Sequence, residues 1–134
     1  MGEISVKVAA AIRSSLIEGQ LPCTTAFRLA RQLGVDPLVI GQTCDQIGVS
    51  LSRCQLGLFG YGPKAEGKHR IVTPLESVPP EMEQEIQAAL EGGKLPCKAA
   101  WQIASTLHCK RLEVSRGAEA LGIRISRCQL GAFE

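Results

Sequence analysis

Six cysteines are the residues of this chain best suited to chemistry. A thiolate is both a nucleophile and a ligand for soft metal ions, so cysteines can build redox, catalytic or metal sites. No Cys-x-x-Cys pair occurs, so the spacing typical of zinc and iron–sulfur sites is missing. Four cysteines occupy matching places in an internal repeat, and two do not. The matched four are Cys23, Cys54, Cys97 and Cys128, and the unmatched two are Cys44 and Cys109.

The matched cysteines allow two interpretations. Cys23 and Cys97 fall in the first turn of an expected helix, where the helix dipole favours the thiolate. Cys54 and Cys128 each follow an arginine, whose positive charge has the same effect. A thiol-based redox or metal sensor would need the four to lie close together in space. Packed thiols of a reduced cytosolic protein, with no metal and no cofactor, are the interpretation that we favour.

No enzyme signature is present in the sequence. The two histidines, His69 and His108, lie far apart, and no Ser–His–Asp or Cys–His arrangement is suggested. Gly57, Gly60 and Gly62 do not follow the helix-opening pattern of a phosphate-binding loop. A unit of about 60 residues also has little room for a buried pocket. We therefore expect a protein that is not an enzyme.

The sequence contains an internal duplication, so the helices and strands that position the cysteines are expected to occur twice. Residues 19–60 and 93–134 align without a gap at an offset of 74, with sixteen identical positions. Leu-Pro-Cys and Ser-Arg-Cys-Gln-Leu-Gly both occur twice. Identity of this extent indicates two like units, so we expect a pseudo-symmetric pair. The boundaries that we assign are 1–60 for the first unit, 61–78 for a linker or wing, and 79–134 for the second unit.

Each unit is predicted to hold three helices and a short strand. Apolar residues recur every four positions within 4–18 and within 80–91, the spacing of a helix face. In the first unit a second helix runs from Pro22 to Gly34, and a third from Asp36-Pro37 to Gly48. Residues 49–53 then alternate as a strand does. If Ile71-Val72 pairs back with that strand, the linker is the tip of a β-hairpin.

Two helices joined by a tight turn and followed by a strand resemble the helix-turn-helix of transcription regulators, in its winged variety. The resemblance rests on a small residue at the helix crossing, a turn residue and an aliphatic anchor below the next helix. These are Ala30, Gly34 and Ile40 in the first unit, and Ala104, His108 and Val114 in the second. His108 departs from the usual turn glycine. The resemblance implies a mainly α fold of two tandem winged-helix-like repeats with short β-strands, and a DNA-binding transcription regulator built as a covalent pseudo-dimer.

Positive charge is concentrated in the second unit. Residues 19–53 hold three basic and two acidic side chains, whereas residues 92–127 hold seven basic and two acidic ones. Lysine and arginine neutralise phosphates, and glutamine can contact base edges. For double-stranded DNA the candidate contacts are therefore Lys98, Lys110, Arg111, Arg116, Arg124 and Arg127, the glutamines Gln42 and Gln46, and the linker residues Lys64, Lys68 and Arg70.

A protein-docking module is the alternative, because the third helix of the first unit, 37–47, has no basic residue. Its exposed Leu38, Val39 and Gln42 would then contact a protein partner. We expect its neighbours Phe27 and Leu33, with their counterparts Trp101 and Leu107, to be mostly buried. The oligomeric state is left open by the sequence.

Composition limits the remaining classes. Aromatic residues make up only 4% of the chain, hydrophobic residues 45%, and the net charge is +2. So few aromatic residues favour an aliphatic core of small helices and argue against base-stacking platforms. No apolar run approaches the ~18 residues of a membrane span, and the N-terminus has no signal-peptide pattern. We expect a cytoplasmic protein with no membrane partner.

Overall fold

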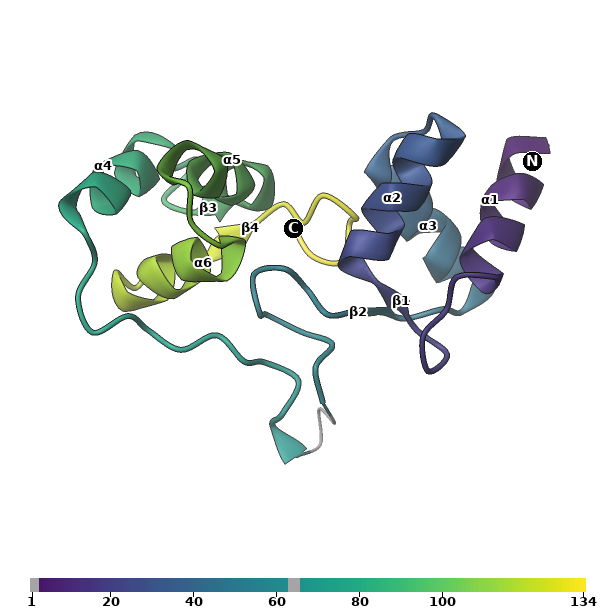
Figure 1. The fold of residues 1–134 in the computed structure, drawn as a ribbon, viewed down its shortest axis with the longest axis horizontal. Helices are drawn as coiled ribbons and strands as arrows, with labels where there is room; N and C mark the ends of the chain where they lie inside the picture. The colour runs from purple at the N-terminus through teal and green to yellow at the C-terminus, as the bar shows by residue number, and fades with distance from the viewer. Residues whose placement is uncertain (1–2, 63–65) are drawn as a thin grey trace.

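The computed structural model describes residues 3–62 and 66–134, and of residues 3–5 only the backbone (Figure 1). Lys64, one of the candidate DNA contacts, lies outside the described residues. The mainly helical class is confirmed. The elements in chain order are α1 (Glu3–Arg13), β1 (Leu21–Pro22), α2 (Cys23–Leu33), α3 (Pro37–Ile47), β2 (Leu51–Ser52), α4 (Pro80–Ala88), β3 (Leu95–Pro96), α5 (Cys97–Leu107), α6 (Arg111–Ala120) and β4 (Ile125–Ser126).

Local signals set the helix ends close to the predicted places. The Asp36 side chain accepts a hydrogen bond of 3.0 Å from the Leu38 N–H and caps α3. Gly34 ends α2 and Gly48 ends α3, both in the left-handed region, with φ of 66° and 73°. His108 takes the same conformation after α5, with φ of 55°. The second turn therefore keeps the geometry of the first although it lacks the glycine.

The predicted strand 49–53 is confined to Leu51–Ser52, and its partner is not the linker. β2 pairs in parallel with β1, and β4 pairs in parallel with β3. The predicted hairpin with Ile71-Val72 is wrong, because the N–H groups of both residues donate to the Gly57 carbonyl instead. Pro22 has an extended backbone before α2, with φ of −62° and ψ of 145°. Leu21–Pro22 is therefore a short strand, and β2 pairs with it.

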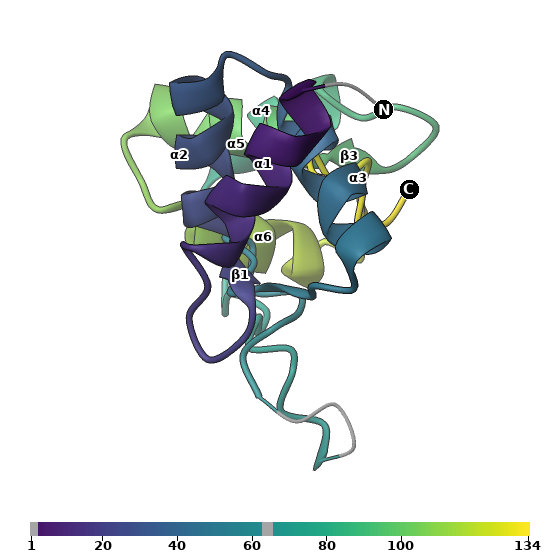
Figure 2. The same cartoon turned by 90° about the vertical axis from the view of Figure 1, so that its right-hand side faces the viewer.

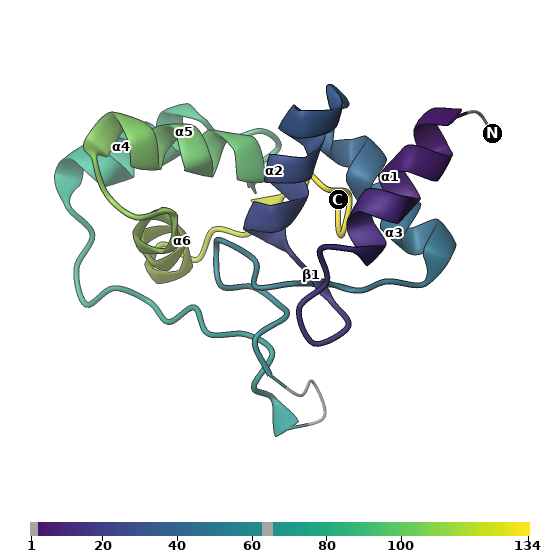
Figure 3. The ribbon, with the colours of Figure 1, turned by 45° about the vertical axis from the view of Figure 1, so that its right-hand side comes forward.

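Each half of the chain contributes a leucine to the hydrophobic core of the other half. One core lies among α1–α3 and the other among α4–α6. Figures 2 and 3 show these two groups of helices from two sides. Leu56 follows β2, yet its fully buried side chain belongs to the core of the second half. Leu130 follows β4, and its side chain belongs to the core of the first half. The boundary at residue 60 therefore does not separate two independent cores.

Close backbone approach supports this exchange. A Cβ at Gly41 in α3 would lie 1.6 Å from the Leu130 carbonyl oxygen, so only glycine fits there. In Figure 1 the C-terminal segment after β4 accordingly runs toward α2 and α3. A second, repeated contact joins the same segments, because Gly131 meets Leu38 of α3 and Gly57 meets Leu112 of α6. Each half thus inserts its Cys-Gln-Leu-Gly turn against the third helix of the other.

Phe27, Leu33, Trp101 and Leu107, which were predicted to be mostly buried, are partly buried and pack against the hydrophobic cores. Phe27 and Trp101 also pack on each other where the halves meet, and Leu33 and Leu107 are the last residues of their helices. Within the described residues, no helix has the length and apolar character needed to cross a membrane.

Candidate functional site: a four-cysteine cluster between the halves

The four matched cysteines line one small pocket between the two halves. Cys23 begins α2 directly after β1, and Cys54 comes two residues after β2, so the parallel pairing of these strands brings both to the same end. The pairing of β3 with β4 does the same for Cys97 and Cys128. All four are free thiols, three of them buried and Cys128 half-buried. The condition that the sequence left open, proximity in space, is met.

Aromatic side chains surround this cluster. The chain has five aromatic residues, and four of them line the cysteine pocket. Phe27 and Trp101 are matched in the repeat, and their ring centroids lie 4.4 Å apart. Phe59 and Phe133 are also matched, with centroids 6.5 Å apart in an edge-to-face arrangement. The scarce aromatic residues therefore form an apolar wall around the thiols.

Polar groups of the turns influence three of the four thiols. The peptide group of Gln55 lowers the pKa of Cys23, and those of Leu56, Leu58 and Phe59 lower the pKa of Cys54. The peptide group of Gln129 lowers the pKa of Cys97, and the side-chain nitrogen of Gln129 donates to the Cys97 sulfur at 3.5 Å. Donors aimed at sulfur stabilise a thiolate more than a thiol.

The turns that carry these donors need unusual backbone. Arg53 and Arg127 precede their cysteines in the left-handed region, each with φ of 49°. Gly57 closes the first turn with φ of 72°, and its N–H lies 2.9 Å from the Cys54 carbonyl. Gly131 closes the second turn onto Cys128 with the same distance. Non-glycine residues with positive φ are uncommon and cluster at functional sites.

Burial is the main cause that raises the pKa of Cys23 to about 12, and the neighbouring thiols Cys54, Cys97 and Cys128 contribute to the same rise. Burial likewise raises the pKa of Cys54 and of Cys97, against the opposing effect of nearby peptide groups. Among the described residues, no three histidine, cysteine, aspartate or glutamate side chains are arranged to hold a metal ion. Four thiolates would repel one another in this setting unless a cation joined them.

The unmatched cysteines lie elsewhere. Cys44 is fully buried in the core of the first half, where burial raises its pKa to about 11. Cys109 is half-buried at the turn before α6, and burial is also the main cause that raises its pKa. Neither lines the pocket of the other four. Cys44 therefore serves as a small buried apolar side chain.

Four of the candidate DNA contacts have partners within the chain. The Arg111 guanidinium lies 3.6 Å from the centroid of the Trp101 ring. Arg116 donates from Nε to the Thr73 carbonyl at 3.0 Å and is 3.4 Å from Glu113. The remaining ion pairs join Arg70 to Glu119 at 2.6 Å and Arg127 to Glu91 at 3.1 Å.

The other candidate cations are free within the part of the chain that the structure describes. Lys68, Lys98, Lys110 and Arg124 are exposed and form no ion pair there. Gln42 and Gln46 are exposed on α3. These six side chains come from α3, α5, the linker and the approaches to α6 and β4, so they do not lie along one helix.

The third helices are not open surfaces. Arg111 and Arg116, two candidate DNA contacts on α6, are both half-buried. The cause is the segment after β2, which packs on α6: Leu75 N–H donates to the Arg116 carbonyl, and Gly57 meets Leu112. On α3, Leu38 stays 41% exposed although it meets Gly131, and Val39 is half-buried.

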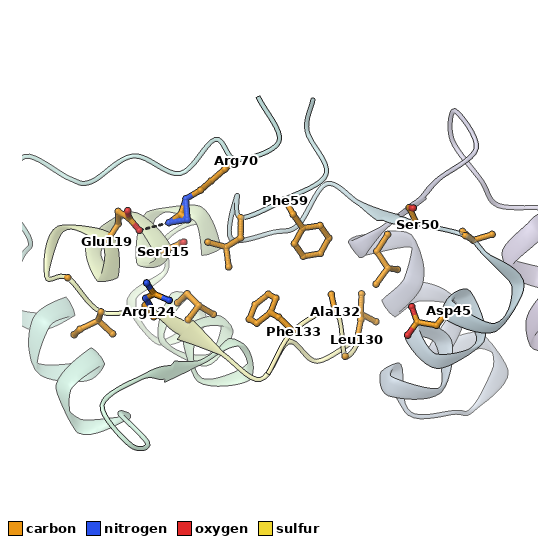
Figure 4. Close-up of a pocket in the computed structure, with 17 residues that line it drawn as sticks. Asp45, Ser50, Phe59, Arg70, Ser115, Glu119, Arg124, Leu130, Ala132 and Phe133 are labelled. Atoms are coloured by element: carbon orange, nitrogen blue, oxygen red, sulfur yellow. Dashed lines mark hydrogen bonds and ion pairs between the residues drawn. The ribbon is translucent and has the colours of Figure 1, made fainter. Parts of the chain in front are cut away.

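A groove of about 930 Å³ runs between the halves on the other side of the phenylalanine pair. Phe59 and Phe133 line both this groove and the cysteine pocket, so the pair stands between them. Figure 4 shows the two rings near each other in the middle of the groove, with the ion pair of Arg70 and Glu119 toward one end and Asp45 toward the other. The groove is lined by matched residues of both halves, as the cysteine pocket is.

No family model, curated protein or solved structure matches this chain. The function must therefore be argued from the site. Sequence reasoning identified the four matched cysteines but not the aromatic wall or the N–H donors. The signal for the aromatic wall was the repeat itself, because Phe59 and Phe133 fall five residues after Cys54 and Cys128.

Proposed function

We propose that this protein is a thiol-based sensor in which four cysteines act as one site. The observation that carries the proposal is the meeting of the four repeat-matched cysteines in one apolar pocket, two from each half. The unmatched Cys44 and Cys109 lie outside it. A duplication that kept only core-filling thiols would have no reason to bring the matched four together.

The site is coupled to the packing of the halves through short stretches of backbone. Leu56 lies two residues after Cys54, and Leu130 lies two residues after Cys128. Each leucine fills the core of the opposite half. A chemical change at the sulfurs therefore acts directly on the turns that hold the halves together. In the proposed mechanism, the state of the thiols sets how tightly these two turns dock.

Amide hydrogen exchange of the full chain, with and without a thiol-directed challenge, tests this proposal. The challenges are zinc and, separately, the thiol oxidant diamide. We expect protection of the turns 54–59 and 128–133 to change together. A Cys54→Ser and Cys128→Ser double variant should lose the response, and a matched Cys44→Ser and Cys109→Ser double variant should keep it. An unresponsive wild-type protein, or a response that survives loss of Cys54 and Cys128, would contradict the proposal.

DNA binding in transcription control is a second candidate function, and two observations favour it. The pairs α2–α3 and α5–α6 are each joined by three-residue turns, as in a helix-turn-helix. Lys98, Lys110 and Arg124 also remain exposed and without an ion pair among the described residues. In this proposal the two units act as a covalent pseudo-dimer, and these cations contact phosphates. Because α6 is covered, the backbone contacts would outweigh base reading.

Affinity for duplex DNA at several salt concentrations tests the second candidate. Each phosphate contact adds about 0.9 to the logarithmic salt slope, so Lys110→Ala should reduce the slope by that amount. Arg127→Ala is the matched control, because Arg127 is already paired with Glu91. Wild-type binding weaker than about 10⁻⁴ M at low salt would contradict DNA binding, since this is the weak end of ordinary non-specific affinity.

A further inference from the structure

We infer that the four matched cysteines, Cys23, Cys54, Cys97 and Cys128, ligate one thiophilic metal centre that bridges the two halves of the chain. The centre is a zinc ion or an iron–sulfur cluster, both of which take four cysteine thiolates. This inference rests on the proposed function, because it requires the four thiols to act as one site. It adds the identity of the ligand.

The donor set selects this chemistry. Besides the four cysteines, the pocket is lined only by aromatic residues, a leucine and two glutamines. No carboxylate or imidazole lines it, so the harder ions that prefer oxygen ligands have no suitable donors there. Soft thiolates favour zinc and iron–sulfur clusters. Four protein ligands also leave no open position for a substrate, which is typical of a structural or sensing centre.

The surroundings suit metal-bound thiolates. The Gln129 side chain donates to the Cys97 sulfur at 3.5 Å, and the peptide groups of both turns favour the thiolates of Cys23, Cys54 and Cys97, as outer-shell donors do around metal sites. Four thiolates around one Zn²⁺ carry a net charge of −2, and these donors spread that charge. The balance of the step is one Zn²⁺ bound and four protons released, with four S–H bonds broken and four Zn–S bonds formed.

A pair of disulfides explains these features less well. A disulfide is uncharged and makes little use of N–H donors, whereas a thiolate needs them. Thiol–disulfide exchange also requires an attacking thiolate to reach the sulfur, and the rings of Phe27, Trp101, Phe59 and Phe133 surround this pocket. The four thiols are not arranged around an ion among the described residues. Metal binding therefore requires the cysteine side chains to rotate toward the ion.

The position of the centre gives it a structural consequence. Two ligands come from the ends of β1 and β2, and two from the ends of β3 and β4. The metal therefore closes a link between segments that lie far apart in the chain. It holds both Cys-Gln-Leu-Gly turns at the place where their leucines enter the opposite core.

The test is metal analysis of the full chain, produced and purified without oxygen. Elemental analysis and a sulfide assay separate zinc from an iron–sulfur cluster, and X-ray absorption counts the sulfur ligands. We expect about one centre per chain, with four sulfur ligands at ~2.3 Å if the metal is zinc. The Cys44→Ser and Cys109→Ser double variant should keep it, and the Cys54→Ser and Cys128→Ser double variant should lose at least tenfold in metal content.

The outcomes separate this inference from the proposed function. A metal-free wild-type protein whose matched cysteines form two disulfides would overturn the metal centre and leave a thiol sensor standing. Metal that persists at full content without Cys54 and Cys128, or that has fewer than four sulfur ligands, would also overturn the inference. Six independent, unresponsive thiols would remove both. The wild-type measurements decide the matter even if the Cys54 and Cys128 variant fails to fold.

Discussion

Replacing Leu130 with alanine tests the exchange of cores between the two halves. Leu130 is 2% exposed, and its side chain packs among α1–α3 although it follows β4. Removing a buried leucine side chain costs the transfer free energy of the lost methyl groups and leaves a cavity, about 2–5 kcal/mol in total. We expect the upper part of that range, because the Leu130 carbonyl also lies against Gly41 and limits collapse of the cavity.

Urea unfolding and hydrogen exchange measure this effect and its location. The free energy of unfolding should fall by about 3–5 kcal/mol, and exchange should accelerate mainly in α1–α3. Leu56→Ala is the reciprocal variant and should accelerate exchange mainly in α4–α6, whose core it fills. Val6→Ala is the control, because Val6 is 71% exposed and should change stability by less than about 0.5 kcal/mol. A cost for Leu130→Ala in that same small range, or faster exchange confined to α4–α6, would refute the exchange of cores.

Three further predictions follow from single contacts. Arg111→Ala should destabilise the protein by about 0.5–2 kcal/mol in thermal unfolding, because Arg111 lies over the Trp101 ring; an unchanged free energy of unfolding would count against this contact. His108→Gly should raise the free energy of unfolding by about 1 kcal/mol, since His108 has a left-handed φ of 55°, and a lower stability would reject the strain. Burial raises the pKa of Cys44 from 9.0 to about 11, so its contribution to stability is full below pH 9 and is lost as the pH rises toward 11. Cys44→Ala should therefore lose less stability than the wild type between pH 9 and pH 11 in urea titrations, and equal losses would contradict this pKa.

Local chemistry made the helices predictable. Asp36-Pro37 at the start of α3 and Gly48 at its end act within a few residues, so the sequence alone locates α3 closely. The same holds for Gly34 after α2. The first helix was expected over 4–18 but ends at Arg13, because the apolar spacing continues past the last helical turn. Periodicity describes a face, and it does not fix where a helix ends.

The arrangement of the site could not be read from local patterns. The parallel pairing of β1 with β2 joins segments thirty residues apart, and two-residue strands leave almost no periodic signal. The insertion of Leu56 and Leu130 into opposite cores is a non-local choice of partner. A core in the same half would satisfy the same hydrophobic pattern. The partial burial of Arg111 and Arg116 on α6 is non-local as well, because the segment after β2 packs on that helix.

The most direct test of the central claim, that the four matched cysteines form one site, is alkylation of the folded wild-type protein followed by mass spectrometry of each cysteine. The thiols are labelled over time at pH 8, before and after titration with a chelator or with a thiophilic metal. We predict that protection of Cys23, Cys54, Cys97 and Cys128 changes together at one titrant concentration, while Cys44 and Cys109 keep their own rates. Four matched cysteines that are labelled at unrelated rates, each unaffected by the titrant, would contradict the account.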